Sequence, residues 1–442
     1  MLRRVNVLPV IMLTLLSSIH TQGVEAASFI RVVEDEGIWW FEDGRGQRFF
    51  SLGVNCIGGC FGHAEESPME DSRKRWIVGR LMEQGFNTAA SWSSPSLWDH
   101  FYVSDQIYTG FREEQDDVFD DSLWKGRLEP CIREEVKPFF GKTNFIGYFI
   151  DNEPKWNAAN TFNLYLGLPA QRAGSRAFIA FLESYYEGSI AKLNGEWGRS
   201  YRAFGDIPSS FCPTAFPSAM EKGVLRAWRN EVAKTYCSRY VALLRSLDPD
   251  HLIMGVRYRG IPDLDLFKSL SPYFDVNSVN DYNRYGNLKP DFETLYKASG
   301  KPLMITEFSF SGFPESGHRS MLFVDVYSQE NRGVGYEKSV LGAARTHSCS
   351  ACTGFSGWTT QSRMRPTGDS CPTRTLDWSQ TMKHRLMRSS GNGSNGPIDR
   401  FTARIGPHIL FRAQRRFWHR SVLRPSPRSW TETPKSGRER LS

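Results

Sequence analysis

Residues 145–154 read FIGYFIDNEP, and the interpretation of the whole chain starts from this stretch. An uncharged run, largely apolar, is followed at once by Asp151, Asn152 and Glu153. Such a run is typical of a strand that is buried on both faces of a parallel sheet. A carboxylate at the carboxyl end of such a strand lies where the active sites of (β/α)8 barrels form. The competing interpretation is a helix-capping turn with Pro154 at a first helical position, and the local pattern favours neither.

Strand-like runs and helical patterns alternate on both sides of this stretch. Strand-like runs occupy 49–55, 86–92, 252–256, 274–279 and 302–306, with a weaker one at 106–108, and helical patterns occupy 73–84, 128–140 and 225–247. This alternation predicts an α/β fold, and its strand count favours a (β/α)8 TIM barrel over an open doubly wound sheet. No Gly-x-Gly-x-x-Gly follows the first strand, which argues against dinucleotide binding. Residues 161–217 interrupt the alternation and predict a helical insertion over the barrel mouth.

A second carboxylate, Glu307, also follows an apolar strand, in the sequence ITEF at 305–308. Two acids at the same end of parallel strands are what cleavage of a glycosidic bond requires. One protonates the leaving oxygen, and the other attacks the sugar carbon or activates water. A single acid at a strand end is often only part of an ion pair at the rim of the core, but two in this periodic context favour catalysis.

Asn152-Glu153 and Glu307 resemble the acid/base and nucleophile of clan A retaining glycoside hydrolases. Residues 147–154, GYFIDNEP, are similar to β-agarases and to the catalytic domain of family 42 β-galactosidases, and 193–198, LNGEWG, resemble a segment of the latter group. The resemblance spans about residues 30–344. It implies that Glu153 is the acid/base, that Asn152 binds the 2-hydroxyl, and that Glu307 is the nucleophile. Retention is then expected, with carboxyl groups about 5–5.5 Å apart.

The implied substrate is a β-linked, galactose-containing, agarose-like polysaccharide or oligosaccharide. Other clan A specificities, such as β-mannan or β-glucan, remain alternatives, as do an inactive frameshifted product and a non-catalytic carbohydrate-binding barrel. Further candidate sugar contacts are polar or aromatic residues near strand ends, namely Asn55, Trp92, Trp156, Arg257, Arg259, Asn280, Asp281 and Tyr282. Tyr282 is the candidate hydrogen-bond donor to the nucleophile. Each has a second interpretation: Arg257 could pair with a carboxylate at the barrel rim, and Trp156 could simply be packed.

Charge is distributed unevenly along the chain. The net charge is +7, but residues 345–442 hold 18 Lys and Arg against 5 Asp and Glu, so the rest of the chain is mildly acidic. We therefore expect no nucleic-acid partner. We interpret 345–442 as a disordered Arg/Ser/Pro-rich tail and hypothesise that it is translated out of frame. Residues 352–360, CTGFSGWTT, do not resemble a strand, so we expect the eighth strand of the barrel to be lost. An out-of-phase reading of their codons permits the aromatic strand His-Trp-Ile-Gln-Trp-Met-Asp-Asn, which supports the frameshift hypothesis.

Three further expectations concern the surroundings of the predicted barrel domain, residues 27–344. Residues 1–26 read as an export signal, with a positive start, an apolar centre and a small-x-small end, so the protein is expected to be secreted or periplasmic, with no other membrane contact. The acidic residues between 113 and 121 are interpreted as solvated acids at a helix start, with a calcium site as the alternative. We expect no metal and no cofactor, and the sequence does not predict the oligomeric state.

Overall fold

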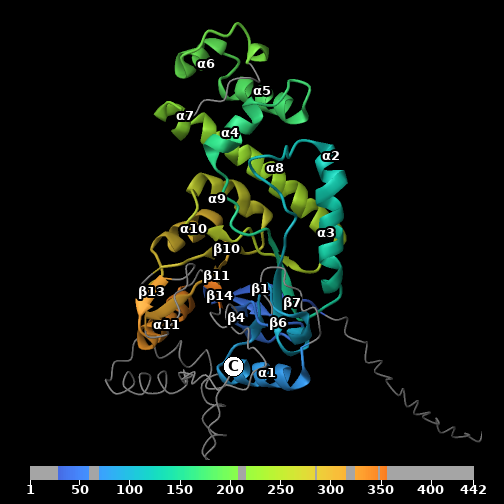
Figure 1. The fold of residues 1–442 in the computed structure, drawn as a ribbon, viewed down its shortest axis with the longest axis vertical. Helices are drawn as coiled ribbons and strands as arrows, with labels where there is room; N and C mark the ends of the chain where they lie inside the picture. The colour runs from blue at the N-terminus through green and yellow to red at the C-terminus, as the bar shows by residue number, and fades with distance from the viewer. Residues whose placement is uncertain are drawn as a thin grey trace, which may run out of the picture.

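The computed structural model describes residues 28–58, 69–207, 216–283, 286–314, 324–346 and 349–355. At its centre lies a nine-stranded sheet in which each neighbouring pair of strands is parallel (Figure 1). In spatial order its strands are β8 (Leu252–Ile253), β7 (Phe145–Ile150), β6 (Tyr102–Ile107), β5 (Thr88–Ala89), β4 (Ser51–Asn55), β14 (Cys349–Phe355), β11 (Leu303–Glu307), β10 (Asn277–Asn280) and β9 (Tyr258–Arg259). The predicted parallel α/β architecture is thus confirmed.

The predicted closed barrel is not confirmed, because the strand ladders run from β8 to β9 as an open series. The two end strands are nevertheless close in sequence, and the segment that joins them hydrogen-bonds on both sides. Met254 N–H donates to the carbonyl of Tyr148 over 2.8 Å, on the β7 side. Arg257 N–H donates to the Ser278 hydroxyl oxygen over 2.9 Å, on the β10 side.

One apolar cluster of the parallel strands is covered by a small antiparallel sheet. This sheet consists of β1 (Arg31–Asp35), β2 (Ile38–Glu42) and β3 (Arg48–Phe49). Phe41 and Phe49 join a buried cluster with residues of the parallel strands and their extensions, including Ile146, Phe149, Met254, Val276 and Met304. Phe49 stacks on Tyr102, the first residue of β6, so the small sheet lies at the amino ends of the parallel strands.

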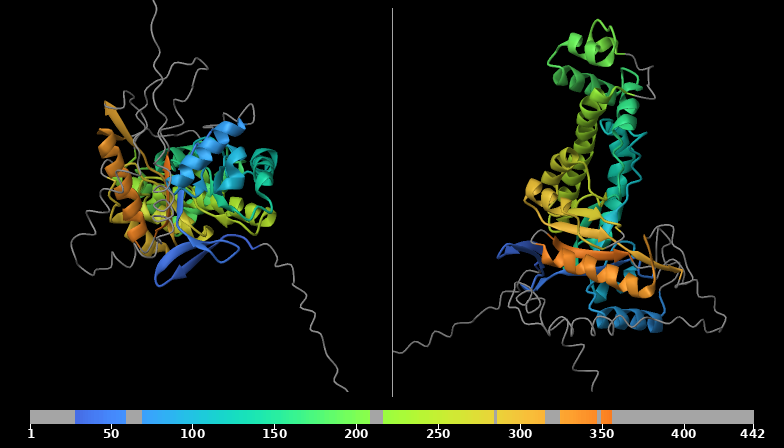
Figure 2. Two further views of the ribbon diagram at one scale, coloured as in Figure 1. Left: turned by 90° about the horizontal axis from the view of Figure 1, so that it is seen from below. Right: turned by 90° about the vertical axis from the view of Figure 1, so that its left-hand side faces the viewer.

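Helices flank the sheet, as the alternating pattern predicts (Figures 1 and 2). The predicted helices at 73–84, 128–140 and 225–247 correspond to α1, α3 and α8. The flanking helices are α1 (Asp71–Glu83), α2 (Asp121–Leu123), α3 (Glu129–Val136), α8 (Val224–Leu247), α9 (Leu264–Leu270), α10 (Asp291–Ser299) and α11 (Gln329–Arg345). Short 3-10 or π turns occupy Pro95–His100, Trp124–Leu128, Lys137–Phe139, Phe204–Asp206 and Ser271–Tyr273. None of the helices within the described residues is both long and apolar enough to span a bilayer.

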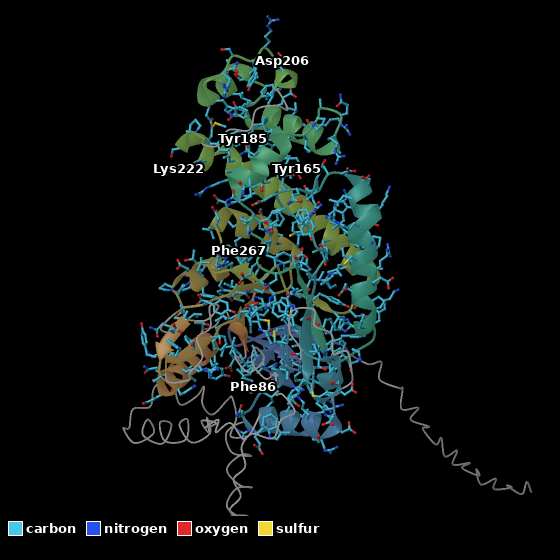
Figure 3. All side chains as sticks on the ribbon, in the orientation of Figure 1. Phe86, Tyr165, Tyr185, Asp206, Lys222 and Phe267 are labelled. Carbon is cyan, nitrogen blue, oxygen red and sulfur yellow. The ribbon has the colours of Figure 1, made fainter. Side chains whose placement is uncertain are left out.

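Helices occupy the predicted insertion, residues 161–217, where the structure describes it. They are α4 (Ala158–Leu166), which begins before the predicted bound, α5 (Ala173–Tyr185) and α6 (Ile190–Trp197). The next helix, α7 (Ser218–Lys222), follows the insertion directly, and all four gather at the end of the molecule opposite α1 (Figure 1). In Figure 3, Tyr185, Asp206 and Lys222 mark this end, and Phe86 marks the other. Local signals set the bounds of these helices: the Asn157 side chain caps α4, and Gly198, with φ of 65°, ends α6.

The expectation that the eighth strand is lost is wrong. Strand β14 lies between β4 and β11 and pairs in parallel with both, with Ala351 opposite Ser51 and Cys352 opposite Ile305. Ladder hydrogen bonds are made by the backbone, so this position accepts a strand without the aromatic residues that we expected there. If the barrel domain ended at residue 344, as the sequence analysis expects, β14 would lie outside the domain that contains its partner strands β4 and β11. Residues 356–442 and the proposed signal at 1–26 lie outside the described residues. Beyond β11, β12 (Phe310–Pro314) and β13 (Val324–Tyr327) form a separate two-stranded sheet.

Candidate active site

The carboxyl ends of the parallel strands bring the predicted site residues together. Asn55 ends β4, Asn280 ends β10 and Glu307 ends β11, while Asn152 and Glu153 follow β7. Because neighbouring strands are parallel, all of these positions lie at the same edge of the sheet. Hydrogen bonds connect them: Asn280 Nδ2 donates to Glu153 Oε1 over 2.9 Å, and Asn55 Nδ2 donates to the carbonyl of Thr306 over 2.9 Å.

Glu307 is held by two donors. Arg257 Nη2 lies 2.6 Å from its Oε1, and the Tyr282 hydroxyl donates to its Oε2 over 2.6 Å. The latter is the contact that the sequence suggested for Tyr282. Burial, reinforced by the adjacent charge of Glu307, raises the pKa of Tyr282 far above its usual range, so the phenol stays a donor. Only 5 % of Glu307 is exposed.

Glu153 lies in a more open environment than Glu307. Its side chain is 24 % exposed, compared with 7 % for Glu307. Besides Asn280, its neighbour is Arg259, whose Nε lies 3.7 Å from Oε2 and whose side chain is 81 % exposed. Such an exposed pair contributes little, so Arg259 is free to turn towards a ligand. The two acids thus differ both in exposure and in their partners.

Each nitrogen of the Arg257 guanidinium hydrogen-bonds to a protein group. Its side chain is fully buried, its Nε donates to Asn152 Oδ1 over 2.7 Å, and its Nη1 donates to Ser91 Oγ over 3.0 Å. The guanidinium carbon also lies 4.9 Å from the centre of the Trp92 ring. In this structure Arg257 thus forms the ion pair with a strand-end carboxylate that is its second interpretation, and its role as a sugar contact stays a prediction.

The asparagines around these acids form one network. Asn152 Oδ1 accepts from Arg257 and lies 3.4 Å from Asn280 Nδ2. Asn280 Oδ1 accepts from the Thr306 hydroxyl over 2.7 Å. Asn55 is fully buried, and its Oδ1 accepts no hydrogen bond from the described residues. Asp281, another candidate sugar contact, is also buried. Its carboxylate forms an ion pair with Lys289 over 2.8 Å.

The two candidate stacking tryptophans differ. Trp92 is partly exposed, has a φ of 63°, and donates its backbone N–H to Asp105 over 3.2 Å. Burial raises the pKa of Asp105 to about 6. Trp156 is only 2 % exposed and packs near Phe111 and Tyr236, with ring centres 6.0 and 5.9 Å away. Trp156 is thus packed in this structure, in agreement with its second interpretation, and its sugar-stacking role stays a prediction.

Sequence reasoning missed Asp151, which precedes the Asn-Glu pair. Its Oδ1 accepts from the Thr109 amide and hydroxyl over 3.1 and 3.3 Å, and its Oδ2 accepts from the Tyr236 hydroxyl. Burial raises the pKa of Asp151 to about 6, although these hydrogen bonds act in the opposite direction. The available signal was its place directly after a strand whose six residues are all buried.

The acidic residues at 113–121 do not gather around a common centre. Asp116 pairs with Arg112 and Arg127, and Asp120 pairs with Arg172 over 2.8 Å. Asp121 pairs with Arg239, also over 2.8 Å. In the described part of the chain, no group of three His, Cys, Asp or Glu residues could hold a metal ion.

Comparisons with known proteins point to agarases. No family model matches the chain. It is 27 % identical over 329 residues to β-agarase B of Vibrio sp. (strain JT0107), covering 67 % of this chain and 33 % of that protein. It is 27 % identical over 304 residues to β-agarase A of the same organism, covering 61 % and 30 %. The chain thus spans about one third of the length of these curated relatives.

Solved structures share the fold at lower sequence identity. The structure of an exo-β-agarase superposes with a TM-score of 0.64 at 18 % identity, over 75 % of this chain and 59 % of that one. An agarase crystal structure gives a TM-score of 0.62 at 18 % identity, with the same coverage. These likenesses support the β-agarase part of the resemblance, whereas the similarity to family 42 β-galactosidases stays a prediction. The chain therefore has the mixed α/β fold of these two solved agarases, and its sequence is similar to those of β-agarases A and B.

Proposed function

We propose that this protein is a glycosidase that hydrolyses O-glycosyl bonds in a β-linked, galactose-containing polysaccharide or oligosaccharide of the agarose type. The observation that carries the proposal is the pair Glu153 and Glu307 at the same edge of the sheet, connected through Arg257, Asn152 and Asn280. The sequence similarity to two β-agarases supports the choice of substrate.

The proposed reaction is a double displacement with retention. Glu307 attacks the anomeric carbon while Glu153 gives its proton to the leaving glycosidic oxygen, which forms a glycosyl-enzyme ester and releases the first product. Glu153 then takes a proton from water, the water oxygen attacks the anomeric carbon, and Glu307 leaves as a carboxylate. Arg257 and Tyr282 suit this nucleophile role, because both donate hydrogen bonds to the Glu307 carboxylate. Asn152 and the exposed Arg259 are the proposed sugar contacts.

We also propose that the strands form a closed (β/α)8 barrel. Residues 252–259 would then act as one interrupted strand, with β8 paired to β7 and β9 paired to β10. The proposal further includes export through residues 1–26 and an out-of-frame origin for the residues after β14. Sequencing the coding DNA across codons 340–360 tests the last point. A confirmed reading frame without a nearby gained or lost base would contradict it.

The activity is tested by incubating the full chain with agarose and with agaro-oligosaccharides and measuring released reducing ends. Glu153→Gln and Glu307→Gln should each lower turnover by about 10²-fold or more. Glu293→Gln, an exposed residue paired with Lys297, is the matched control. A fluorinated sugar that traps the ester should add its mass to the peptide containing Glu307. Undiminished turnover in either site variant would contradict the proposed mechanism. If the parent chain bound these substrates without cleaving them, the proposal that it is an enzyme would be wrong.

A further inference from the structure

The segment between β6 and α2 contacts the loop that carries Glu153 at two separate points. Figure 1 shows α2 far from β6, so this connection runs well beyond the carboxyl ends of β6 and β7. At its start, Thr109 donates to Asp151 from both its amide and its hydroxyl. Further along, the Glu113 carboxylate accepts from the amides of Lys155 and Trp156. Glu153 lies between the two points of contact.

The loop needs such support because its backbone is strained. Asp151, Glu153 and Trp156 have φ angles of 54°, 50° and 42°, in the left-handed region that residues other than glycine rarely adopt. Three such residues within six positions do not persist unless the surrounding structure fixes them. The conformation that directs Glu153 into the site therefore depends on contacts from outside the loop.

Glu113 provides a specific contact of this kind. Its Oε1 accepts from Lys155 N–H over 2.9 Å, and its Oε2 accepts from Trp156 N–H over 2.7 Å. Charged acceptors make hydrogen bonds stronger than neutral ones do, and two amides bound by one carboxylate fix both distance and orientation. The neighbouring Glu114 makes no such contact with the loop backbone and instead accepts from the side chain of Asn160 over 2.7 Å.

The position of Glu113 is itself fixed by a tight turn. Arg112 N–H donates to Asp116 Oδ2 over 2.7 Å, and Asp116 N–H donates back to the Arg112 carbonyl over 2.8 Å. Phe111 stacks on Tyr236 with ring centres 4.2 Å apart, and Tyr236 in turn donates to Asp151. Glu113 therefore connects a well-packed segment, residues 111–116, to the loop that carries Glu153.

We infer that Glu113 is a positioning residue that holds Glu153 in its orientation for proton transfer by binding the backbone of Lys155 and Trp156. This inference rests on the proposed function, because it assigns Glu113 a part in that reaction. It gives a role to a residue that the sequence alone placed among solvated helix-start acids.

The test compares Glu113→Gln with the matched control Glu114→Gln in the full chain. Glutamine keeps the size of the side chain but offers one acceptor oxygen, so one of the two loop amides meets an NH2 group instead. Each variant is assayed on an agaro-oligosaccharide, whose leaving sugar needs a proton, and on its dinitrophenyl glycoside, whose leaving group needs none. Glu113→Gln should lose about 10²-fold in kcat/KM on the oligosaccharide and less than about 3-fold in kcat/KM on the dinitrophenyl glycoside, because kcat/KM reports the first step, in which only the oligosaccharide needs the proton. Glu114→Gln should match the parent on both.

Equal losses on both substrates would overturn the inference, since general damage to the fold does not depend on the leaving group. Amide hydrogen exchange decides the matter without turnover. Exchange in the peptide spanning residues 153–157 should speed up in Glu113→Gln and not in Glu114→Gln, whereas unchanged exchange overturns the inference. A parent chain inactive on every oligosaccharide contradicts the proposed function instead, and the exchange result still decides whether Glu113 holds the loop.

Discussion

Arg257 and Glu307 form an ion pair of 2.6 Å in which the arginine side chain is fully buried and the glutamate nearly so. The same guanidinium reaches Asn152 and Ser91, so one cation fixes groups from the ends of three strands. A buried charge left without its partner is strongly unfavourable, so replacing either residue of this pair alone should destabilise the protein.

Arg257→Lys should therefore preserve the charge and lose the geometry. A lysine cannot make the forked set of hydrogen bonds of a guanidinium, so Asn152 and Ser91 lose their donors. We expect kcat/KM to fall by about 10²-fold, equivalent to about 3 kcal/mol. Arg45→Lys, in the turn between β2 and β3 with a side chain that is 81 % exposed, should retain kcat/KM within a few-fold, and steady-state kinetics on agaro-oligosaccharides compare the two. A milder effect at Arg257 than at Arg45 would contradict this assignment.

Tyr282→Phe should remove one of the two hydrogen bonds to Glu307 without exposing the carboxylate. A hydrogen bond to a charged group contributes about 1.5–3 kcal/mol, so turnover should fall by roughly 10- to 10²-fold. The raised pKa of Tyr282 gives a second readout. In an ultraviolet titration, the parent and the variant should show the same tyrosinate absorbance up to pH 11, as Tyr282 is still protonated there. An extra ionisation near pH 10 in the parent alone would show that Tyr282 is solvated.

Asp151 predicts a pH dependence of folding stability. Its pKa is about 6 in the folded protein and 3.8 for an ordinary solvated aspartate, so the folded state binds the proton more tightly. The stabilisation from this proton is complete below pH 4 and is lost as the pH rises through 6. A shift of this size corresponds to about 3 kcal/mol. Between pH 4 and 7, the free energy of unfolding of the parent should therefore fall relative to that of Asp151→Asn, measured by urea unfolding. A difference that does not change with pH would refute the burial of this acid.

The sequence predicted β7 at its observed bounds because its apolar residues are buried on both faces, which is the strongest pattern a parallel strand can show. It also identified Glu153, Glu307 and Tyr282 as neighbours, because strand ends of a parallel sheet meet at one edge. The sequence left two interpretations open for Trp156, because a tryptophan that covers a core and one that covers a sugar look alike in sequence. Glu113 was missed because its partners are backbone amides about 40 residues away, and no side-chain pattern encodes such a contact.

Strand β14 escaped prediction because its residues, CSACTGF, are mostly small and carry little strand preference. Its pairing with two neighbours leads to the last prediction. Cys352 lies opposite Leu52 on one side and Ile305 on the other, so proline there removes an N–H and places a ring inside the sheet. Cys352→Pro should destabilise the protein by about 3 kcal/mol or more and separate β4 from β11. Cys352→Ser keeps the backbone donor and nearly the same size, so its melting temperature should stay close to that of the parent. Equal melting temperatures for the proline and serine variants would show that residues 349–355 do not complete the sheet, and the loss of the eighth strand expected from the sequence would then hold.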